Sequence, residues 1–186
     1  MTAAIAVVVV THDSAGHVAD TLGALTPQLR ADDELIVVDN GSHDDTVATV
    51  RAAAPQAWIV EQDNVGFAGG ASAGAAVAAA PLLLFLNPDA RPAPGCLDEL
   101  RRVADSQPGW GAWQALVTMD GGATINTAGN VTHFLGMGWA GRCGRPVGEA
   151  PAEPAEVPFA SGAALAVRRE AWERTGGFDA RYFMYC

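Results

Sequence analysis

The feature that most constrains the fold is a set of four short apolar runs, each followed by polar residues. The runs are "IAVVVV" at 5–10, "LIVV" at 35–38, "AWIV" at 57–60 and "LLLFL" at 82–86. Runs of this length without polar alternation are typical of strands that are buried on both faces of a parallel sheet. We therefore predict four buried strands in the first half of the chain.

The segments between these runs predict helices. The stretch 18–29 carries its Val and Leu residues at intervals of four, three and four, which is one helical face, and Ser14 is placed to cap that helix. The stretch 68–79 is mostly Ala and Gly and predicts a helix packed closely on the sheet. Alternating strands and helices imply right-handed βαβ units, so we predict a three-layer α/β fold with a mostly parallel sheet.

The second half of the chain changes character. Apolar residues after Pro94 predict a helix, 110–118 predicts a strand, and "MDGGAT" at 119–124 predicts the turn of a hairpin. The stretch 129–158 is rich in Gly, Pro and Glu, and we predict a mobile loop there. A strand within 159–167 and a short helix that ends at glycine follow.

Composition argues against several classes of protein. The net charge is −10, all 11 basic residues are Arg, and they form no run, which argues against a nucleic-acid partner. The three cysteines are far apart and form no CxxC pair, so neither a zinc knuckle nor a disulfide framework is predicted. No run of about 18 apolar residues is present. We expect a cytoplasmic setting, compatible with peripheral contact at the inner face of the membrane.

Polar residues gather after each predicted strand, at Thr11–Asp13, Asp39–Asn40, Asn64–Gly66 and Asn87–Asp89. Open α/β sheets bind ligands at the carboxyl ends of their strands, so we expect these segments to converge on one edge. Carboxylates there can accept hydrogen bonds from a base or ribose, or hold Mg²⁺ or Mn²⁺ against a diphosphate. This combination predicts a transferase that uses a sugar nucleotide.

Other nucleotide-binding and hydrolytic motifs do not fit. A dinucleotide site needs G-x-G-x-x-G after the first strand, where this chain has "THDSAG", and a P-loop needs a Lys that the chain lacks. "GASAG" at 70–74 matches the pattern of a nucleophile elbow, but it lies inside a predicted helix and not at a strand-to-helix turn.

Six segments in order resemble the inverting family 2 glycosyltransferases with the GT-A fold, and among them the rhamnosyltransferase-like enzymes of bacterial cell-surface polysaccharide synthesis. The segments are "VVVVTHDSAGHVADTL", "LIVVDNGSHDDT", "DNVGFAGGASAG", "LLLFLNPDA", "FASGAALAVRREAW" and "GGFDARYFMYC". They cover nearly the whole chain. The resemblance implies transfer from a nucleotide-diphosphate sugar to a polysaccharide or cell-envelope acceptor, carbohydrate or lipid-linked.

The resemblance also implies roles for residues of the donor site. Thr11, Asp13 and Asp39 would contact the donor, with Asp39 on the base or ribose, and Asn64 and Gly66 would line the nucleotide pocket. From the residues alone, Asp13 could instead be only an N-terminal helix residue and Asp39 only an Asx-turn residue.

Further roles follow for the diphosphate and acceptor sides. Asp89 would hold Mg²⁺ or Mn²⁺ and the diphosphate, whereas Asn87, which stands where many relatives have an Asp, would bind the nucleotide sugar without contacting the metal. Gly162 would form the floor near the acceptor, and Trp139 is a candidate for stacking on it. The four histidines show no metal spacing, and we expect them at the surface or in loops: His12, His17, His43 and His133.

One departure from the family pattern concerns catalysis. The acidic pair that supplies the general base in relatives is expected beyond Cys186, so we expect the chain as it stands to turn over poorly. We expect 1–118 to form the part that binds the nucleotide sugar and 119–186 the acceptor-side part, incomplete at its end. Two alternatives remain open, a nucleotide-sugar-binding module without catalysis and, less favoured, a nucleotidyltransferase.

Overall fold

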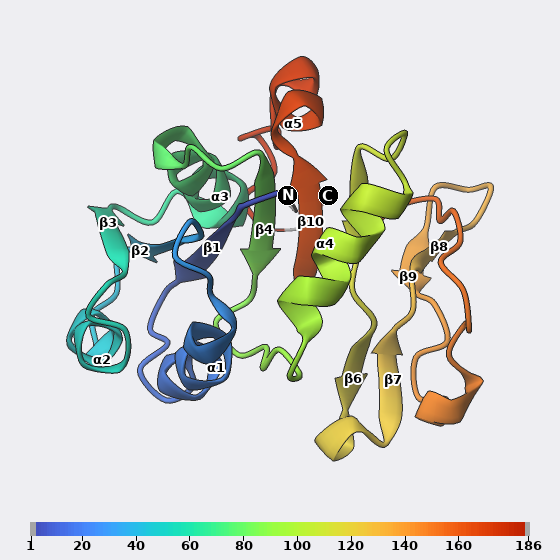
Figure 1. Ribbon diagram of the computed structural model, residues 1–186, viewed down its shortest axis with the longest axis horizontal. Coiled ribbons are helices and arrows are strands. Elements are labelled where there is room, and N and C mark those ends of the chain that lie inside the picture. Colours follow the sequence, from blue (N-terminus) through green and yellow to red (C-terminus); the bar gives the residue numbers. More distant parts are fainter. Residues whose placement is uncertain (1–2, 185–186) are drawn as a thin grey trace.

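The computed structural model describes residues 3–184. Its centre is a six-stranded sheet with the order β3-β2-β1-β4-β10-β5 (Figure 1). Strands β1 to β4 are parallel, and β10 runs antiparallel to both of its neighbours. The strands are β1 (Ile5–Thr11), β2 (Glu34–Asn40), β3 (Trp58–Gln62), β4 (Leu82–Leu86), β5 (Ala112–Gln114) and β10 (Ala164–Arg168). The predicted α/β class with a mostly parallel sheet is confirmed.

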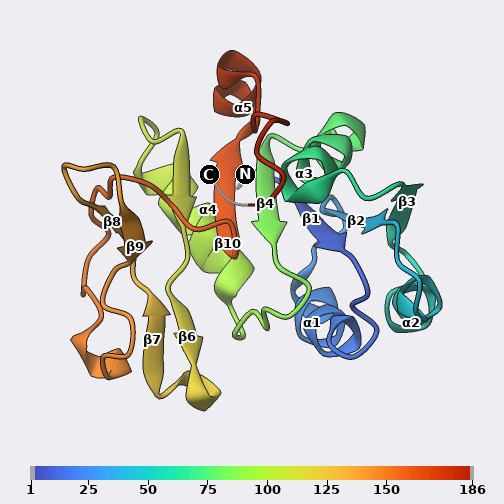
Figure 2. The ribbon, with the colours of Figure 1, turned by 180° about the vertical axis from the view of Figure 1, so that it is seen from behind.

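Helices cover both faces of this sheet and make three layers. One hydrophobic cluster joins alternate sheet residues to α1, α2 and α4, and a second joins the opposite face to α3 and α5. Figure 1 looks onto the side of α4, and Figure 2 onto the side of α3 and the segment that follows α5. The helices are α1 (Val18–Leu25), α2 (Thr46–Ala53), α3 (Gly66–Val77), α4 (Cys96–Ser106) and α5 (Arg169–Thr175).

Helix α1 begins later than a cap at Ser14 would require. The N-cap residue is His17, and the carbonyl of Ser14 accepts hydrogen bonds from the N–H groups of His17 and Val18 at 3.0 Å each. The Ser14 hydroxyl turns back to the backbone of His12. The predicted cap is therefore wrong, because a tight turn precedes the helix. A 3₁₀ turn, Thr26–Gln28, continues α1.

Glycines let α3 lie close to the sheet, as predicted. A Cβ atom on Gly70 would come within 2.6 Å of a methyl group of Val10, and one on Gly74 within 2.3 Å of a methyl group of Val8. Side chains at these two positions would push the helix away from β1. Gly70 and Gly74 thus let α3 pack directly on β1, and this placement of α3 also positions the β3–α3 loop that precedes it.

The second half contains more regular structure than predicted. The expected strand at 110–118 divides into β5 and β6 (Val117–Met119), and β6 pairs with β7 (Thr124–Thr127) across a 3₁₀ turn, Asp120–Gly122, which confirms the hairpin.

The prediction of a mobile loop across 129–158 is wrong for part of its length. It contains the antiparallel pair β8 (Asn130–Thr132) and β9 (Gly138–Ala140), and a 3₁₀ turn at Val147–Glu149. Strands of three residues are too short to show periodicity in the sequence. They are held here by neighbours distant in the chain, as in the bridge between Asn130 and Phe159.

A buried ion pair ties α4 to the sheet. The side chains of Arg101 and Asp33 are 1% and 0% exposed, and the guanidinium group binds the Asp33 carboxylate directly. The same carboxylate accepts a hydrogen bond from the N–H of Ile5 at 2.9 Å, and Arg101 Nε donates to the carbonyl of Ala3 at 3.3 Å. No helix within residues 3–184 is long and apolar enough to cross a membrane.

Candidate active site

The carboxyl ends of β1 and β2 meet in a buried polar pair. Thr11 lies opposite Asp39 in the sheet register, and its hydroxyl donates to Asp39 Oδ1 at 3.2 Å. Ser42 adds two hydrogen bonds, from its hydroxyl to Oδ1 at 2.5 Å and from its N–H to Oδ2 at 3.1 Å. A carboxylate has about four lone-pair positions, so Asp39, only 5% exposed, keeps one free on Oδ2.

The Asx-turn alternative for Asp39 is not met as such, because the backbone N–H that its side chain accepts belongs to Ser42, three residues on, whereas an Asx turn is closed two residues on. The bond from the Ser42 N–H to Asp39 Oδ2 closes the turn after β2. It does not exclude contact with a ligand, because Oδ2 retains one acceptor position. From the sequence a turn role and a donor-site role for Asp39 are alternatives, and the geometry allows both.

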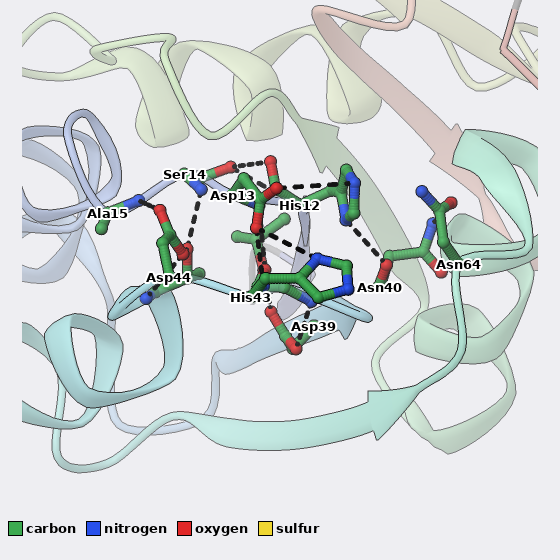
Figure 3. A network of polar contacts seen from close by, with 12 residues as sticks. His12, Asp13, Ser14, Ala15, Asp39, Asn40, His43, Asp44 and Asn64 are labelled. Atoms are coloured by element: carbon green, nitrogen blue, oxygen red, sulfur yellow. Dashed lines mark hydrogen bonds and ion pairs between the residues drawn. The ribbon is translucent and has the colours of Figure 1, made fainter.

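Asn40 connects β2 to the β3–α3 loop, and sequence reasoning gave it no role of its own. Its side chain is 3% exposed and donates to Asn64 Oδ1 at 3.0 Å and to the carbonyl of Gly66 at 3.1 Å. Its Oδ1 accepts from Gln62 Nε2 at 2.9 Å and from the N–H of Val65 at 3.3 Å. Asn40 thus uses both ends of its amide to fix this loop, and Figure 3 shows it beside Asn64.

Asp13 stands at the exposed side of the same edge, between two histidines (Figure 3). Its backbone has a left-handed conformation, with φ of 47°, and its Oδ1 accepts from the N–H of His43 at 2.6 Å. The nitrogens His12 Nε2 and His43 Nδ1 lie 3.9 and 3.8 Å from its carboxylate oxygens. The hydrogen bond from His43 and the two nearby imidazoles lower the pKa of Asp13 below its ordinary value of 3.8.

This arrangement changes two expectations. Asp13 is not an N-terminal helix residue, because α1 begins only at Val18. His12 and His43 are loop residues as expected, but the fold brings their rings to 6.1 Å centroid distance beside the predicted donor site. They are 31 residues apart in the sequence, and only the adjacency of β1 and β2 could have indicated their approach.

Asp44 links the loop that follows β1 to the loop that follows β2, at the start of α2. Its Oδ2 accepts from the N–H of Ala15 at 3.1 Å, and its Oδ1 accepts from the N–H of Thr46 at 3.0 Å and also from the Thr46 hydroxyl. The Thr46 hydroxyl is the main cause of the lowered pKa of Asp44. Together with Asp13 and Asp39, Asp44 makes the first two strand ends one hydrogen-bonded unit.

Asn64 and Gly66 form a tight turn at the start of α3. Asn64 Oδ1 accepts the N–H of Gly66 at 3.0 Å, and Gly66 has φ of +77°. Gly66 is buried beneath Phe183, since a Cβ atom on it would be 2.1 Å from the Phe183 carbonyl oxygen. The N–H of Phe67 donates to this same oxygen at 2.7 Å. Because Gly66 has no side chain, the segment after α5 can pack against the start of α3. This role adds to the predicted place of Gly66 in the nucleotide pocket.

The β4 end carries Asn87 and Asp89. The half-buried Asn87 donates its N–H to the carbonyl of Ala163 at 3.0 Å, and the carbonyl of Pro88 accepts the Thr21 hydroxyl at 2.7 Å, so the turn is held from two sides. Asp89 is exposed, and within residues 3–184 its carboxylate has no hydrogen-bond or ion-pair partner. It is the unengaged carboxylate at this end of β4.

The carboxylate at the end of β4 suits a hard cation that also binds a phosphate group of a ligand. No group of three or more His, Cys, Asp or Glu residues within the described chain is arranged to hold a metal. Mg²⁺ is usually bound by one or two carboxylates together with substrate phosphates and water. The free carboxylate of Asp89 fits that mode and does not fit an all-protein cage.

The predicted acceptor residues lie apart. Gly162 sits beside the ring of Phe67, where a Cβ atom would be 3.2 Å from two ring carbons, and its neighbour Ala163 binds Asn87. Trp139 belongs to β9, in a separate two-stranded sheet beyond β6 and β7 (Figures 1 and 2). The structure brings Gly162 to the candidate site and does not bring Trp139 there.

The general base predicted beyond Cys186 lies outside the described residues, but the segment that leads toward it is placed. Phe178 packs on Phe85 at 5.3 Å and on Trp172 at 5.0 Å between ring centroids. From there the chain returns to the start of α3, where Phe183 meets Gly66 and Phe67. The segment 178–184 therefore ends beside the Asn64 turn.

The mostly parallel sheet with polar residues at its strand ends is that of a GT-A-type α/β protein. Residues 6–175 match the model of glycosyl transferase family 2, and the chain belongs to this family. Among curated proteins it is 29% identical, over an alignment 216 positions long, to the N-acetylglucosaminyl-diphospho-decaprenol L-rhamnosyltransferase of Mycobacterium tuberculosis, covering 100% of this chain and 68% of that protein.

Solved structures share the fold. A mannosyltransferase from Pyrobaculum calidifontis, in complex with GDP-Man and Mn²⁺, superposes with a TM-score of 0.69 at 23% identity, over 97% of this chain and 48% of that one. S. aureus TarS 1–349 with UDP gives 0.72 at 14% identity, over 97% and 51%. The chain spans about half the length of these solved proteins.

Proposed function

We propose that this chain forms the donor-binding part of a glycosyltransferase that moves a sugar, with inversion, from a nucleotide-diphosphate sugar to a lipid-linked or polysaccharide acceptor of the cell envelope. The observation that carries the proposal is the linked set of strand ends. Thr11, Asp39, Asn40 and Asn64 join three loops by hydrogen bonds, and Asp89 presents an unengaged carboxylate at the fourth.

Each residue has a task in this proposal. The free acceptor position of Asp39 takes a hydrogen bond from the base or ribose, and Thr11 holds the carboxylate in place. Asn64 shapes the turn against which the nucleotide lies, and Asn40 holds Asn64. Asp89 would hold Mg²⁺ or Mn²⁺, which supplies positive charge against the diphosphate leaving group.

The relatives support the choice of substrates. The mycobacterial relative is named for rhamnosyl transfer to a decaprenol-linked acceptor, and one structural neighbour was solved with a nucleotide sugar and Mn²⁺. Their names suggest for this chain a nucleotide-linked hexose or deoxyhexose and an acceptor on a lipid carrier. A cytoplasmic setting at the inner membrane face accords with such substrates.

A nucleotide-sugar-binding module without catalysis is the second candidate, and one observation favours it. Deprotonation of an acceptor hydroxyl needs a carboxylate that is a good base, but the pKa of Asp13 is lowered. Asp39 is buried in hydrogen bonds, and Asp89 is assigned to the metal. None of these three predicted site carboxylates is suited to this work, and Asp63, which directly follows β3, is exposed and has no hydrogen bond within residues 3–184 that would orient its carboxylate.

The proposal is tested by calorimetric titration of the chain with UDP, dTDP and GDP, and with AMP as a mononucleotide comparison. One nucleoside diphosphate should bind well above the others, and Asp39→Ala should lose that preference together with most of the affinity. Asp105→Ala, an exposed change on α4, is the matched control and should bind as the unaltered chain does. Equal, weak binding of all the nucleotides would contradict the proposal.

Turnover separates the two candidates. The chain is incubated with the preferred nucleotide sugar and a prenyl-diphosphate-linked acceptor, and release of the nucleoside diphosphate is measured. Binding with transfer supports the transferase, whereas binding without transfer supports the module without catalysis.

A further inference from the structure

An open groove runs beside helix α4, which faces the viewer in Figure 1. Its volume is about 1100 Å³, just above the range of roughly 300–1,000 Å³ that is usual for small-molecule sites. It begins at residues 93–96, at the start of α4, and reaches residues 109–111, beyond the end of this helix. Because α4 has 11 residues and is therefore about 16 Å long, the groove suits an extended molecule.

Apolar side chains make most of the lining of this α4 groove. Leu100 and Trp113, which are 4% and 7% exposed, line it together with Leu116, which is 45% exposed. Small residues, chiefly Ala, Gly and Pro, make up most of the rest. The α4 groove is therefore a concave apolar surface, which is the usual lining of a ligand site.

The polar side chains that α4 and β5 contribute to the groove already have partners. Arg102 donates twice to the Glu99 carboxylate, from Nε at 2.8 Å and from Nη2 at 2.5 Å. Gln114 Oε1 accepts the N–H of Ser161 at 2.7 Å. A saccharide or a peptide would bring many polar groups here that find few free partners, which is costly. A hydrocarbon chain needs no such partners, because its burial is favourable by itself.

The segment 151–158, which we call the strap, supplies the other wall of the groove. Within residues 3–184 the strap makes no hydrogen bond and no ion pair. Val157 packs on Gly129, where a Cβ atom would be 2.3 Å from a Val157 methyl group. The pKa of Arg102 is raised mainly by its hydrogen bond with Glu99 and to a smaller extent by the charge of Glu153 on the strap. The strap can therefore move to admit a ligand without breaking a hydrogen bond.

The groove adjoins the segments that lead to the candidate active site. Ala160 lines it, and the next residue, Ser161, is bonded to Gln114 in the groove. Two residues further on, the carbonyl of Ala163 accepts the N–H of Asn87 at 3.0 Å. The other end of the groove, at residues 93–96, follows the turn that carries Asp89. A molecule in the groove would thus lie on the acceptor side of the proposed metal position.

We propose that the α4 groove binds the prenyl chain of a lipid-linked acceptor and that the strap closes over this chain. The inference rests on the proposed function, because it names the part of the acceptor that the groove takes. Isoprene units present only apolar surface, so the apolar lining and the paired polar groups suit them. A prenyl chain held along α4 would place its diphosphate end near the segment 160–163, which is bonded to Asn87.

The test uses Cys96, which lines the groove, as a reporter of its occupancy. Burial raises the pKa of the Cys96 thiol, so alkylation by iodoacetamide is run at alkaline pH and followed by mass spectrometry of the Cys96 peptide. Farnesyl phosphate, kept below the concentration at which it aggregates, should slow this alkylation about tenfold at ten times its Kd. Cys143 is exposed and does not line the groove, so its alkylation rate in the same sample should stay unchanged.

Probe length and one variant test the apolar lining. Geranyl phosphate, which is one isoprene unit shorter, should bind about tenfold or more weakly than farnesyl phosphate, and inorganic phosphate should not protect Cys96. Leu116→Asp should weaken protection by farnesyl phosphate about tenfold or more, because it places a charge in the groove. Leu135→Asp is the matched control, since Leu135 is 68% exposed outside the groove, and it should be protected as the unaltered chain is. Circular dichroism and the UDP titration establish that both variants are folded.

Three results would overturn the inference. One is alkylation of Cys96 at the same rate with and without farnesyl phosphate. Another is equal slowing at Cys96 and Cys143, or equal protection of the Leu116 and Leu135 variants, which would show that the lipid coats the protein without entering the groove. The third is protection by N,N′-diacetylchitobiose and not by farnesyl phosphate, which would make the groove a saccharide site. Failure of UDP to bind the unaltered chain would count against the proposed function alone, because the alkylation assay contains no nucleotide.

Discussion

The side-chain amide of Asn40 and the side-chain oxygen of Asn64 lie 3.0 Å apart, and this contact joins the end of β2 to the start of α3. Asn64 uses the same oxygen to hold the N–H of Gly66. The loop that is proposed to face the nucleotide is therefore set by a residue that is itself almost completely buried. Asn40 acts as a positioning residue, and its contribution can be separated from general stability.

Asn40→Ala should remove four hydrogen bonds and leave Asn64 unheld. We expect the free energy of unfolding to fall by about 1–3 kcal/mol and the affinity for the preferred nucleoside diphosphate to fall about tenfold. Urea denaturation and calorimetry measure the two effects. The matched control is Asn130→Ala, because Asn130 is also buried but bonds Thr127 in the second half of the chain. The control should lose stability and keep its affinity, and equal loss of affinity in both variants would refute the positioning role.

Gly66→Ala should displace the segment that carries Phe183. Its Cβ atom would meet the Phe183 carbonyl oxygen at 2.1 Å, in addition to the cost of about 1–2 kcal/mol for a side chain at positive φ. Gly95→Ala isolates that backbone cost, since Gly95 has φ of +82° and open space around it. Limited proteolysis should cleave the segment 178–184 faster in Gly66→Ala than in Gly95→Ala. Identical cleavage rates would show that Gly66 does not seat this segment.

Arg101→Met should destabilise the fold strongly, because it leaves the carboxylate of Asp33 buried without its partner. We expect a loss of about 3–5 kcal/mol in the free energy of unfolding, measured in urea. Arg102→Met provides the comparison, since its ion pair with Glu99 is exposed and typically worth less than about 1 kcal/mol. If the two variants were equally stable, the buried pair would not anchor α4.

The pKa of Asp13 gives a prediction in acid. Its folded-state pKa lies below 3.8, so its ionised form favours the folded state at pH values above the unfolded pKa. That contribution is lost as pH falls through the lower, folded pKa. Carbon-detected NMR titration of the Asp13 carboxyl should give a midpoint below 3.8, and Asp13→Asn should remove this part of the pH dependence of stability. A midpoint at or above 3.8 would contradict the hydrogen bond from His43.

The sequence predicts the sheet well because the strands β1, β2 and β4 are continuous apolar runs, which can be buried only between two helical layers. It also predicts that the polar strand ends gather, since parallel strands end at the same edge. These inferences depend on local pattern and on topology, both of which a single sequence contains.

The contacts between those ends cannot be read in the same way. The bond from Asn40 to Asn64 spans 24 residues and depends on the relative placement of two loops, and the pair of Arg101 and Asp33 spans 68. The strands β8 and β9 have three residues each, too few for periodicity to indicate them. The contact between Phe183 and Gly66 depends on the path of the chain after α5, for which the sequence has no local signal.

The central claim is that a nucleoside diphosphate binds at the strand ends with a metal held by Asp89. The most direct measurement is calorimetric titration with UDP and dTDP, with and without Mn²⁺, on the unaltered chain and on Asp89→Ala. We predict that Mn²⁺ strengthens binding of one of the two nucleotides to the unaltered chain and has no effect on binding to Asp89→Ala. Metal-dependent binding that persists in Asp89→Ala would contradict the account.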